Sequence, residues 1–504
     1  MISSTRTGTD DTDQTTGPIP VASFMRQCLV SDLGGYYTAE TAGRDQFGQK
    51  GDFVTSPEIS QIFGELVGLW IVAEWMAQGR KKEGVYLMEV GPGRGTLMDD
   101  ILRTIRNFKD FSSAIEAVYL VEASQGLRQA QHKLLCGNNS LKETEIGHES
   151  YSKYGKDLKI VWCEDVRLLP KEGNKTPFIV AHEFFDALPI HIFQSVPPAA
   201  AAEQIQTPTG PIDAKRLPRS ARENQWRELV VSPTPPFATH NDLGTPKNMQ
   251  SGPVPDFQLT LSKAATPHSM YLPEQSERYK AIKSVEHALI EVSPESQAYA
   301  ADFAVRIGGG QLPTGRHQQH RPNTRSVTPE TDHDMVDKPE PSGAALIMDY
   351  GPAGTIPTNS LRGIKRHQHV SPLSEAGTVD ISADVDFLSL AESAINASLG
   401  VEVHGPIDQA RFLEGMGIQE RAAQLVKQAL DKERAGKRED DSARKKEDLT
   451  ETVKRIETGW KRLVDRGPQG MGKLYQFMAI VPHKPVKQGE QVRRPVGFGG
   501  DIAV

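Results

Sequence analysis

From Val85 onward the chain alternates short apolar runs with helical patterns, and this alternation constrains the fold more than any other feature of the sequence. The apolar runs are VYLMEV (85–90), AVYLVEA (117–123), LKIVWCED (158–165) and PFIVAHE (177–183). Between them, TLMDDILRTIRNF and SQGLRQAQHKLL have the spacing of apolar residues that is typical of helices. Strands that alternate with helices indicate βαβ units, so the sequence predicts an α/β fold with a parallel sheet.

A glycine-rich run lies directly after the first predicted strand and directly before the first predicted helix. It reads Glu89-Val90-Gly91-Pro92-Gly93-Arg94-Gly95-Thr96. Glycine lets a backbone turn tightly and approach a ligand, and the N-terminus of the next helix offers free N–H donors. The run lacks the Gly-Lys-Ser/Thr ending of a P-loop, and its spacing differs from G-x-G-x-x-G.

The spacing E-x-G-x-G-x-G is the form found in S-adenosylmethionine-dependent methyltransferases with a Rossmann-like sheet. We therefore expect Glu89, Gly91, Gly93 and Gly95 to bind S-adenosyl-L-methionine. The alternative is a tight strand-to-helix turn that binds no ligand.

Acidic residues stand at the ends of the next two predicted strands. Glu122 ends the second, where a carboxylate can accept hydrogen bonds from both ribose hydroxyls of a nucleoside. Asp165, or its neighbour Glu164, ends the third and could reach the adenine amino group. A solvated acid at a strand end is the alternative for each residue taken alone.

The fourth predicted strand runs into the segment HEFFDALP (182–189). Ligands of open α/β sheets bind at the carboxyl ends of the strands, so Glu183 and Asp186 should lie near the reacting group of a bound cofactor. The alternative is a turn in which Asp186 caps the backbone and the two phenylalanines are core residues. We interpret His182 as a turn residue rather than a base.

Charge and cysteine content exclude several classes of protein. The 504 residues include 58 Lys and Arg and 65 Asp and Glu, for a formal net charge of −7, which disfavours nucleic acid as a partner. Three distant cysteines cannot form a disulfide framework or a Cys-rich zinc site, and indicate a reducing compartment. No apolar stretch is long enough to span a bilayer.

Composition also divides the chain. We expect a disordered leader (1–20), an N-terminal helical segment (21–80), a Rossmann-like core (81–390), a C-terminal helical and strand segment (391–482) and a tail (483–504). Pro-rich or polar insertions, too polar to pack, should interrupt the core at about 197–222, 233–275 and 311–342. The charged run 432–457 reads as a solvated helix or a flexible loop.

Several longer segments, taken together, resemble a known family. They are GDFVTSPEISQIFGELVGLW (51–70), EVGPGRGTLMDDILR (89–103), AHEFFDALPIHIFQ (181–194), WRELVV (226–231), ALIMDYG (345–351), SLRGIKRHQHVSPL with ISADVDF (360–387) and MGKLYQFMAIV (471–481). In this order they are similar to the MidA-like family, mitochondrial protein arginine methyltransferases that assist assembly of respiratory complex I. That family usually has Asn where His182 stands.

The resemblance implies a function and a partner. It implies symmetric dimethylation of an arginine in a core complex I subunit, with S-adenosyl-L-methionine as methyl donor, in the mitochondrial matrix. The leader itself is a poor transit peptide, because Asp10, Asp11 and Asp13 interrupt the acid-poor pattern. Glu183 and Asp186 are the candidate catalytic pair, since a carboxylate can orient a guanidinium.

The sequence leaves two other functions open. One is an assembly chaperone that binds the cofactor without catalysis. The other is an NAD(P)-dependent oxidoreductase on the same kind of sheet, which the glycine spacing disfavours.

We predict no metal site. The scattered histidines lack zinc-ligand spacing with cysteines or acids, and we interpret them as surface residues: His268, His317, His320, His333, His367 and His369. We interpret Trp70 and Trp75 as core residues of a helix.

Overall fold

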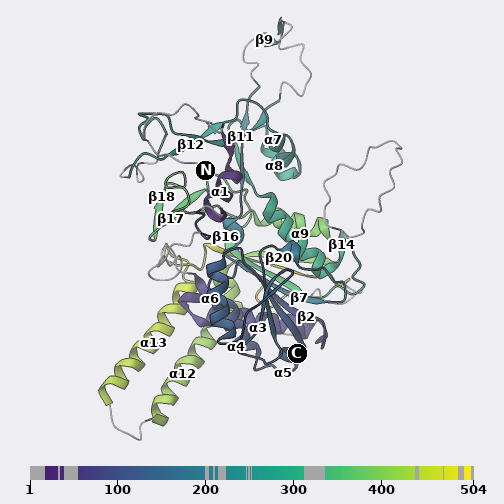
Figure 1. Ribbon diagram of the computed structural model, residues 1–504, viewed down its shortest axis with the longest axis vertical. Helices are drawn as coiled ribbons and strands as arrows, with labels where there is room; N and C mark the ends of the chain where they lie inside the picture. The colour runs from purple at the N-terminus through teal and green to yellow at the C-terminus, as the bar shows by residue number, and fades with distance from the viewer. Residues whose placement is uncertain are drawn as a thin grey trace. The chain divides into compact units, whose positions relative to one another are not determined.

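The computed structural model describes most of the chain and divides it into two compact units. The described residues are 17–31, 34–38, 55–198, 204–207, 210–213, 223–245, 247, 250, 252–311, 335–436, 442–468, 470–485 and 493–500. The larger unit contains 26–190, 291–372 and 376–504, and the smaller contains 1–25, 191–290 and 373–375. Both α and β elements are present, so the fold class is the predicted α/β (Figure 1).

The larger unit is built on a nine-stranded sheet. The strands in sheet order are β20 (Val401–Asp408), β21 (Tyr475–Pro482), β16 (Ala344–Tyr350), β7 (Thr176–His182), β2 (Val85–Val90), β3 (Ile115–Val121), β6 (Lys159–Cys163), β5 (Gly147–Tyr151) and β4 (Lys142–Thr144). The five central strands, β16 to β6, pair in parallel, and the flanking strands pair antiparallel. The four strands predicted after Val85 are confirmed within two residues at each end.

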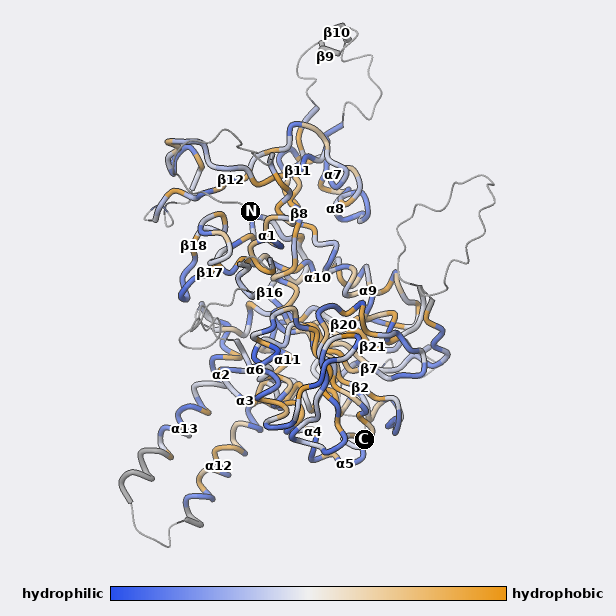
Figure 2. Tube along the Cα trace, in the orientation of Figure 1, coloured by the Kyte–Doolittle hydropathy of each residue, from blue (hydrophilic) through white to orange (hydrophobic). Residues whose placement is uncertain are grey.

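Hydrophobic burial explains why these segments form central strands. Every residue of β2 and β7 is buried, as expected for a parallel sheet covered on both faces. One apolar cluster contains residues of α3 (Gln61–Ala77) and α4 (Thr96–Ile105). A second contains residues of α9 (Pro294–Gly308) and α10 (Phe387–Ala397). Figure 2 shows the hydrophobic residues gathered along the strands of the sheet. The core positions of Trp70 and Trp75 are confirmed.

The remaining elements are shorter or peripheral. In the larger unit they are α2 (Ser56–Ile59), α5 (Lys109–Ala114), α6 (Gln125–Cys136), η1 (Val166–Leu168), η2 (Phe185–Ala187), β14 (Gly310–Gln311), β15 (Met335–Val336), β17 (Arg362–Lys365), β18 (Gln368–Val370), β19 (Asp380–Ser382), α11 (Gln409–Gly415), α12 (Ile418–Gly436) and α13 (Ser442–Val464). Helix α1 (Val21–Val30) has residues in both units. The charged run 432–457 falls mainly in α12 and α13, so the helix interpretation is confirmed for its described part.

The long helix α3 of the N-terminal segment is preceded by a separate short helix. Ser56, Pro57 and Glu58 belong to α2 and not to α3. Ser60 has an extended backbone with φ of −155°, which ends α2. Its hydroxyl accepts a hydrogen bond from the N–H of Ile62 at 3.3 Å, so Ser60 caps α3. Ser56 and Ser60 are both possible caps in the sequence, and the extended backbone at Ser60 makes Ser60 the cap of α3.

The smaller unit has its own sheet. Its strands run in the order β1 (Ile19–Pro20), β11 (Gln225–Pro233), β8 (His191–Val196) and β13 (Leu289–Val292), and β12 (Phe257–Leu261) also pairs with β11. Helices α7 (Pro267–Tyr271) and α8 (Glu277–Ile282), the 3₁₀ helix η7 (Leu272–Glu274) and the hairpin of β9 (Gln204–Thr207) with β10 (Gly210–Asp213) complete it.

Two segments predicted to lie outside any core contribute to this sheet. The expected insertion 233–275 contains β12 and α7. Strand β12 packs because Phe257 is buried and supplies the apolar contact that a packed strand needs. The end of the expected leader forms β1, in which Ile19 pairs with Val231 of β11. Residues 1–16 and 312–334, which belong to the leader and to the third insertion, lie outside the described residues.

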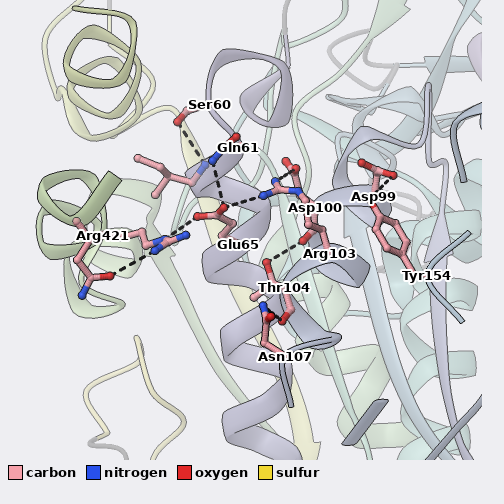
Figure 3. Close-up of polar contacts among 12 residues, drawn as sticks. Ser60, Gln61, Glu65, Asp99, Asp100, Arg103, Thr104, Asn107, Tyr154 and Arg421 are labelled. Atoms are coloured by element: carbon pink, nitrogen blue, oxygen red, sulfur yellow. Dashed lines mark hydrogen bonds and ion pairs between the residues drawn. The ribbon is translucent and has the colours of Figure 1, made fainter. Parts of the chain in front are cut away.

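A buried carboxylate joins three helices of the larger unit. Glu65 of α3 accepts hydrogen bonds from Arg103 of α4 at 3.0 Å and from Arg421 of α12 at 2.7 Å (Figure 3). Arg103 also pairs with Asp100. The Glu65 side chain is only 3% exposed, so its charge depends on both guanidinium groups for compensation.

Among the described helices, none is long and apolar enough to cross a membrane.

We expect Glu65→Ala to lower the free energy of unfolding by about 3 kcal/mol, because the change leaves two partly buried guanidinium groups without their shared carboxylate. Urea unfolding followed by circular dichroism measures it. Glu457→Ala is the matched control, since Glu457 pairs with Lys461 on an exposed face of α13 and should change stability little. Equal effects of the two substitutions would contradict the role assigned to Glu65.

Candidate functional site

A cavity of about 620 Å³ lies at the carboxyl edge of the central strands of the larger unit. Its walls include residues that end or follow β2, β3, β6 and β7: Gly91, Gly93, Glu122, Asp165 and Glu183. The order of these strands reverses between β2 and β7, because the chain continues from β2 toward β3 on one side and from β7 toward β16 on the other. Open α/β sheets bind ligands at such a switch point.

The glycine loop wraps the end of β2 in conformations that favour glycine. The φ angles of Gly91, Gly93 and Gly95 are 63°, 52° and 83°. A Cβ atom on Gly91 would lie 2.6 Å from Cδ2 of Phe184, so this glycine also allows the segment after β7 to pack against the loop. Gly95 does not line the cavity; it precedes α4 as its N-cap and closes the turn through its N–H to the carbonyl of Pro92.

Glu89 points a buried carboxylate at the cavity. It is 2% exposed, and its Oε2 atom has no hydrogen-bond partner among the described residues. Burial, reinforced by the nearby charge of Glu122, raises the pKa of Glu89 to about 8, although the N–H of Met98 opposes the shift. A buried acceptor without a hydrogen-bond partner destabilises the protein by its desolvation free energy unless a ligand donates to it. Glu89 is therefore suited to bind a donor group.

Glu122 lies beside the glycine loop and is held in place by hydrogen bonds. Its Oε1 accepts from the N–H of Ser124 at 2.8 Å, and its Oε2 accepts from Nε2 of Gln131 at 3.2 Å. Burial raises the pKa of Glu122 to about 7 despite these two bonds. The carboxylate keeps acceptor capacity for a ligand, because each oxygen has two lone pairs.

Gln131 is a residue of the site that no sequence motif indicated. Its Nε2 also donates to the carbonyl of Gly93 at 2.6 Å, and its Oε1 accepts from Nε1 of Trp162 at 2.9 Å. This fully buried amide therefore ties the glycine loop, Glu122 and β6 together. A signal was available, since Gln131 stands four residues from both Leu127 and Leu135 on the apolar face of α6.

Asp165 lines the cavity, and its carboxylate is already engaged. It caps η1 by accepting from the N–H of Arg167 at 2.8 Å and from Nε of the same arginine at 2.9 Å. The Arg167 guanidinium holds the pKa of Asp165 below its usual range. Glu164, the alternative residue, pairs with Arg128 and is largely exposed.

Glu183 follows β7 in a strained conformation and faces the cavity. Its φ is 50°, unusual for a residue other than glycine, and such strain is found at functional sites. Its Oε1 accepts a hydrogen bond from the hydroxyl of Tyr475 at 2.6 Å. Burial raises the pKa of Glu183 to about 8, against the effect of Tyr475, and the charges of Asp186 and Glu58 raise it further. Glu58 also lines the cavity and was not predicted.

Asp186 does not line the cavity. Its Oδ2 lies 3.7 Å from the guanidinium of Arg362, which also contacts Asp384 at 2.5 Å. Burial raises the pKa of Asp186 to about 6, and Arg362 opposes the shift. The predicted pairing of Asp186 with Glu183 around one ligand is therefore not what the structure brings together, because the turn at Glu183 directs the two carboxylates differently.

Asp349 determines the path of this turn. It is the second-last residue of β16 and has no exposed surface, and its Oδ2 accepts from the N–H groups of Phe184 at 3.0 Å and Phe185 at 2.8 Å. These partners are about 165 residues away in sequence, so no local pattern indicates them. His182 was expected in a turn, but it is the last residue of β7 and lines the cavity. Burial lowers the pKa of His182 to about 3, so the neutral ring is a weak base.

Comparison with known proteins finds a matching family model and similar named proteins. Residues 66–407 match the family model described as "Putative S-adenosyl-L-methionine-dependent methyltransferase". The chain is 34% identical to the protein arginine methyltransferase NDUFAF7, mitochondrial, of Rattus norvegicus, over 95% of this chain and 84% of that protein. The human protein of the same name is 32% identical, with the same coverage of both chains.

The fold is also found in solved structures. The crystal structure of a "likely methyl transferase" from Burkholderia thailandensis, bound to S-adenosyl-homocysteine, aligns with a TM-score of 0.57 at 18% identity. The alignment covers 92% of this chain and 88% of that one. The likeness supports the predicted Rossmann-like methyltransferase fold.

We expect Gly91→Ala to weaken binding of S-adenosyl-L-methionine at least about tenfold, because the added Cβ displaces Phe184 or the loop. Calorimetric titration measures the affinity. Gly79→Ala is the control, since Gly79 also has a positive φ but has open space around its Cβ position. If both variants bind as the natural sequence does, the close packing at Gly91 does not shape the ligand loop.

We expect Glu122→Ala to weaken the same ligand by about 1.5–3 kcal/mol, or roughly ten- to a hundredfold, because hydrogen bonds to a carboxylate are lost. Glu116→Ala is the matched control at the opposite end of β3, where Glu116 pairs with Lys175 outside this cavity. An unchanged dissociation constant for Glu122→Ala would make Glu122 a structural acceptor for Ser124 and Gln131 only.

Proposed function

Since the chain belongs to the S-adenosyl-L-methionine-dependent methyltransferase family, we propose that it methylates arginine in a protein substrate. The relatives at 32–34% identity are named protein arginine methyltransferases of mitochondria. We propose the mitochondrial matrix as the location, a core subunit of respiratory complex I as the substrate, and symmetric dimethylation as the product, with a role in assembly of the complex.

The observation that carries the proposal is the carboxylate of Glu183 on the cavity wall. An arginine side chain is cationic and planar, and it is recognised best by a carboxylate that accepts its N–H groups. Glu58 is a second carboxylate on the same wall, and its charge raises the pKa of Glu183. Two neighbouring carboxylates repel each other, so a cation that binds beside both lowers the cost of ionising them.

The residues around the cavity fit the cofactor. The loop glycines allow close backbone approach, Glu122 offers acceptors to ribose hydroxyls, and Glu89 has a buried oxygen that lacks a partner among the described residues. When bound, S-adenosyl-L-methionine supplies an electrophilic methyl group on a sulfonium. The volume of about 620 Å³ is typical of cavities that enclose small ligands.

We propose that Glu183 positions the attacking nitrogen and accepts its proton. The hydroxyl of Tyr475 donates to Oε1 of Glu183 and fixes the carboxylate, while Oε2 can accept from a guanidinium. With a pKa of about 8, the ionised form of Glu183 is a stronger base than an ordinary carboxylate, and it can take the proton that the nitrogen releases once it has gained its methyl group. We propose that Asp186 has an indirect role, through Arg362, in holding the segment after β7.

The direct test is incubation of the purified protein with labelled S-adenosyl-L-methionine and core complex I subunits, followed by mass spectrometry of the arginines. Symmetric dimethylarginine on one subunit supports the full proposal. Monomethylarginine or asymmetric dimethylarginine as the product would contradict the proposed symmetric dimethylation. Cofactor binding without any methylated arginine would favour the non-catalytic assembly chaperone instead.

We expect Glu183→Gln to keep the affinity for S-adenosyl-L-methionine and to lower arginine methylation at least about tenfold, because the amide cannot take a proton. Asp186→Asn should lower it less, since Asp186 contacts Arg362 rather than the cavity. Single-turnover rates at saturating cofactor measure both effects. Wild-type rates in both variants, with cofactor still bound, would make the segment after β7 purely structural.

The pH profile gives a further readout of the same variant. Below pH 8 the Glu183 carboxyl is mainly protonated, so kcat/KM for the protein substrate should rise as pH increases through about 8. Glu183→Gln should lose this rise. A rise that persists in the variant would assign the titration to another group.

A further inference from the structure

Two histidines and a glutamate of the smaller unit gather around one point. His191 begins β8, Glu228 lies in β11, and His268 lies in α7. Phe193 pairs directly with Glu228 in the antiparallel register, and residues two apart on a strand share a face. The side chains of His191 and Glu228 are therefore diagonal neighbours on one face of the sheet, and His268 approaches them from the helix.

The carboxylate of Glu228 faces both imidazoles. Its Oε1 lies 2.7 Å from Nδ1 of His191, and its Oε2 lies 3.7 Å from Nδ1 of His268. The two rings are 4.2 Å apart between centroids, and one nitrogen or oxygen from each of the three residues lies within 4.8 Å of the others. Three potential metal ligands from three separate elements thus converge.

The charge of Glu228 needs compensation. The side chain is fully buried, and no lysine or arginine of the described chain forms an ion pair with it. In the described part of the chain, its partners are the two imidazoles and the hydroxyl of Thr266. A buried carboxylate is normally paired with a cation or coordinates a metal, and imidazoles are common metal ligands.

We propose that His191, Glu228 and His268 bind a divalent zinc-class cation through the two Nδ1 atoms and the carboxylate. Two imidazoles and one carboxylate form a ligand set that zinc prefers, with a solvent molecule in the fourth position. His268 is about half exposed, so that position can open to water. The site goes beyond the methyltransferase activity and does not depend on it.

The distances suit this ion. Bonds of about 2.0–2.1 Å at tetrahedral angles separate two ligand atoms by roughly 3.3 Å. The observed separations of 2.7 Å to Oε1 and 3.7 Å to Oε2 of Glu228 lie on either side of this value. The hydroxyl of Thr266 donates to Oε2 of Glu228 at 2.5 Å and orients the carboxylate, as groups behind metal ligands commonly do.

The bound ion would link β8, β11 and α7, which are separate in sequence. Because a metal that binds only the folded state stabilises it, zinc should raise the unfolding temperature of the protein. The unfolding temperature therefore tests zinc binding without an assay of enzyme activity.

The test uses the full chain, treated with a chelator and then titrated with zinc chloride by calorimetry, with metal content and thermal unfolding measured in parallel. His268→Gln removes one ligand from a half-exposed position. His287→Gln is the matched control, since His287 is an exposed histidine of the same unit and is not in the cluster. Circular dichroism checks that each variant is folded, and affinity for S-adenosyl-L-methionine, whose cavity lies in the larger unit, should be the same in all of them.

We expect about one zinc ion per chain and a zinc-dependent rise in unfolding temperature for the natural sequence and for His287→Gln. His268→Gln should bind zinc at least about tenfold more weakly and lose the rise. Magnesium should not replace zinc, because it prefers oxygen ligands. Absence of stoichiometric zinc, or equal affinity in His268→Gln and His287→Gln, would overturn the proposal and leave a hydrogen-bonded pair of His191 and Glu228.

Discussion

The parallel pairing of β2 with β3 on one side and β7 on the other is the constraint on which the rest of the larger unit depends. Strands that pair in parallel must all return to the same edge, so the loops that follow them meet there. Because every residue of β2 is buried, a shift of its register would disrupt the packing on both faces of the sheet. The glycine loop, Glu122 and Glu183 are thereby fixed around one cavity.

Chemistry in this cavity follows from carboxylates that are buried but incompletely compensated. Glu89, Glu122 and Glu183 all have raised pKa values, and desolvation is the main cause for each. Such groups cost stability in the free protein, and donors or cations that reduce the cost are bound preferentially. These carboxylates suit the hydroxyl and amine donors of the family's cofactor, and they are the basis on which a cationic arginine is proposed as substrate.

Charge is compensated differently elsewhere in the molecule. Glu65 has two arginines, Asp186 has Arg362, and their contacts hold neighbouring elements together. Glu228 in the smaller unit has only imidazoles as potential cations among the described residues. This contrast, rather than any sequence motif, separates the proposed zinc site from the structural ion pairs, because a histidine can serve as a metal ligand where an arginine cannot.

The sequence by itself determined the parallel strands, the glycine loop and the acids at strand ends, because hydrophobic period, glycine and chain order act locally. Only the tertiary structure decided that Glu183 faces the cavity while Asp186 faces Arg362, since a positive φ redirects the chain between them. It also placed Gln131 and Asp349 behind the site. Contacts between residues far apart in sequence depend on strand register and helix packing, which no local pattern contains.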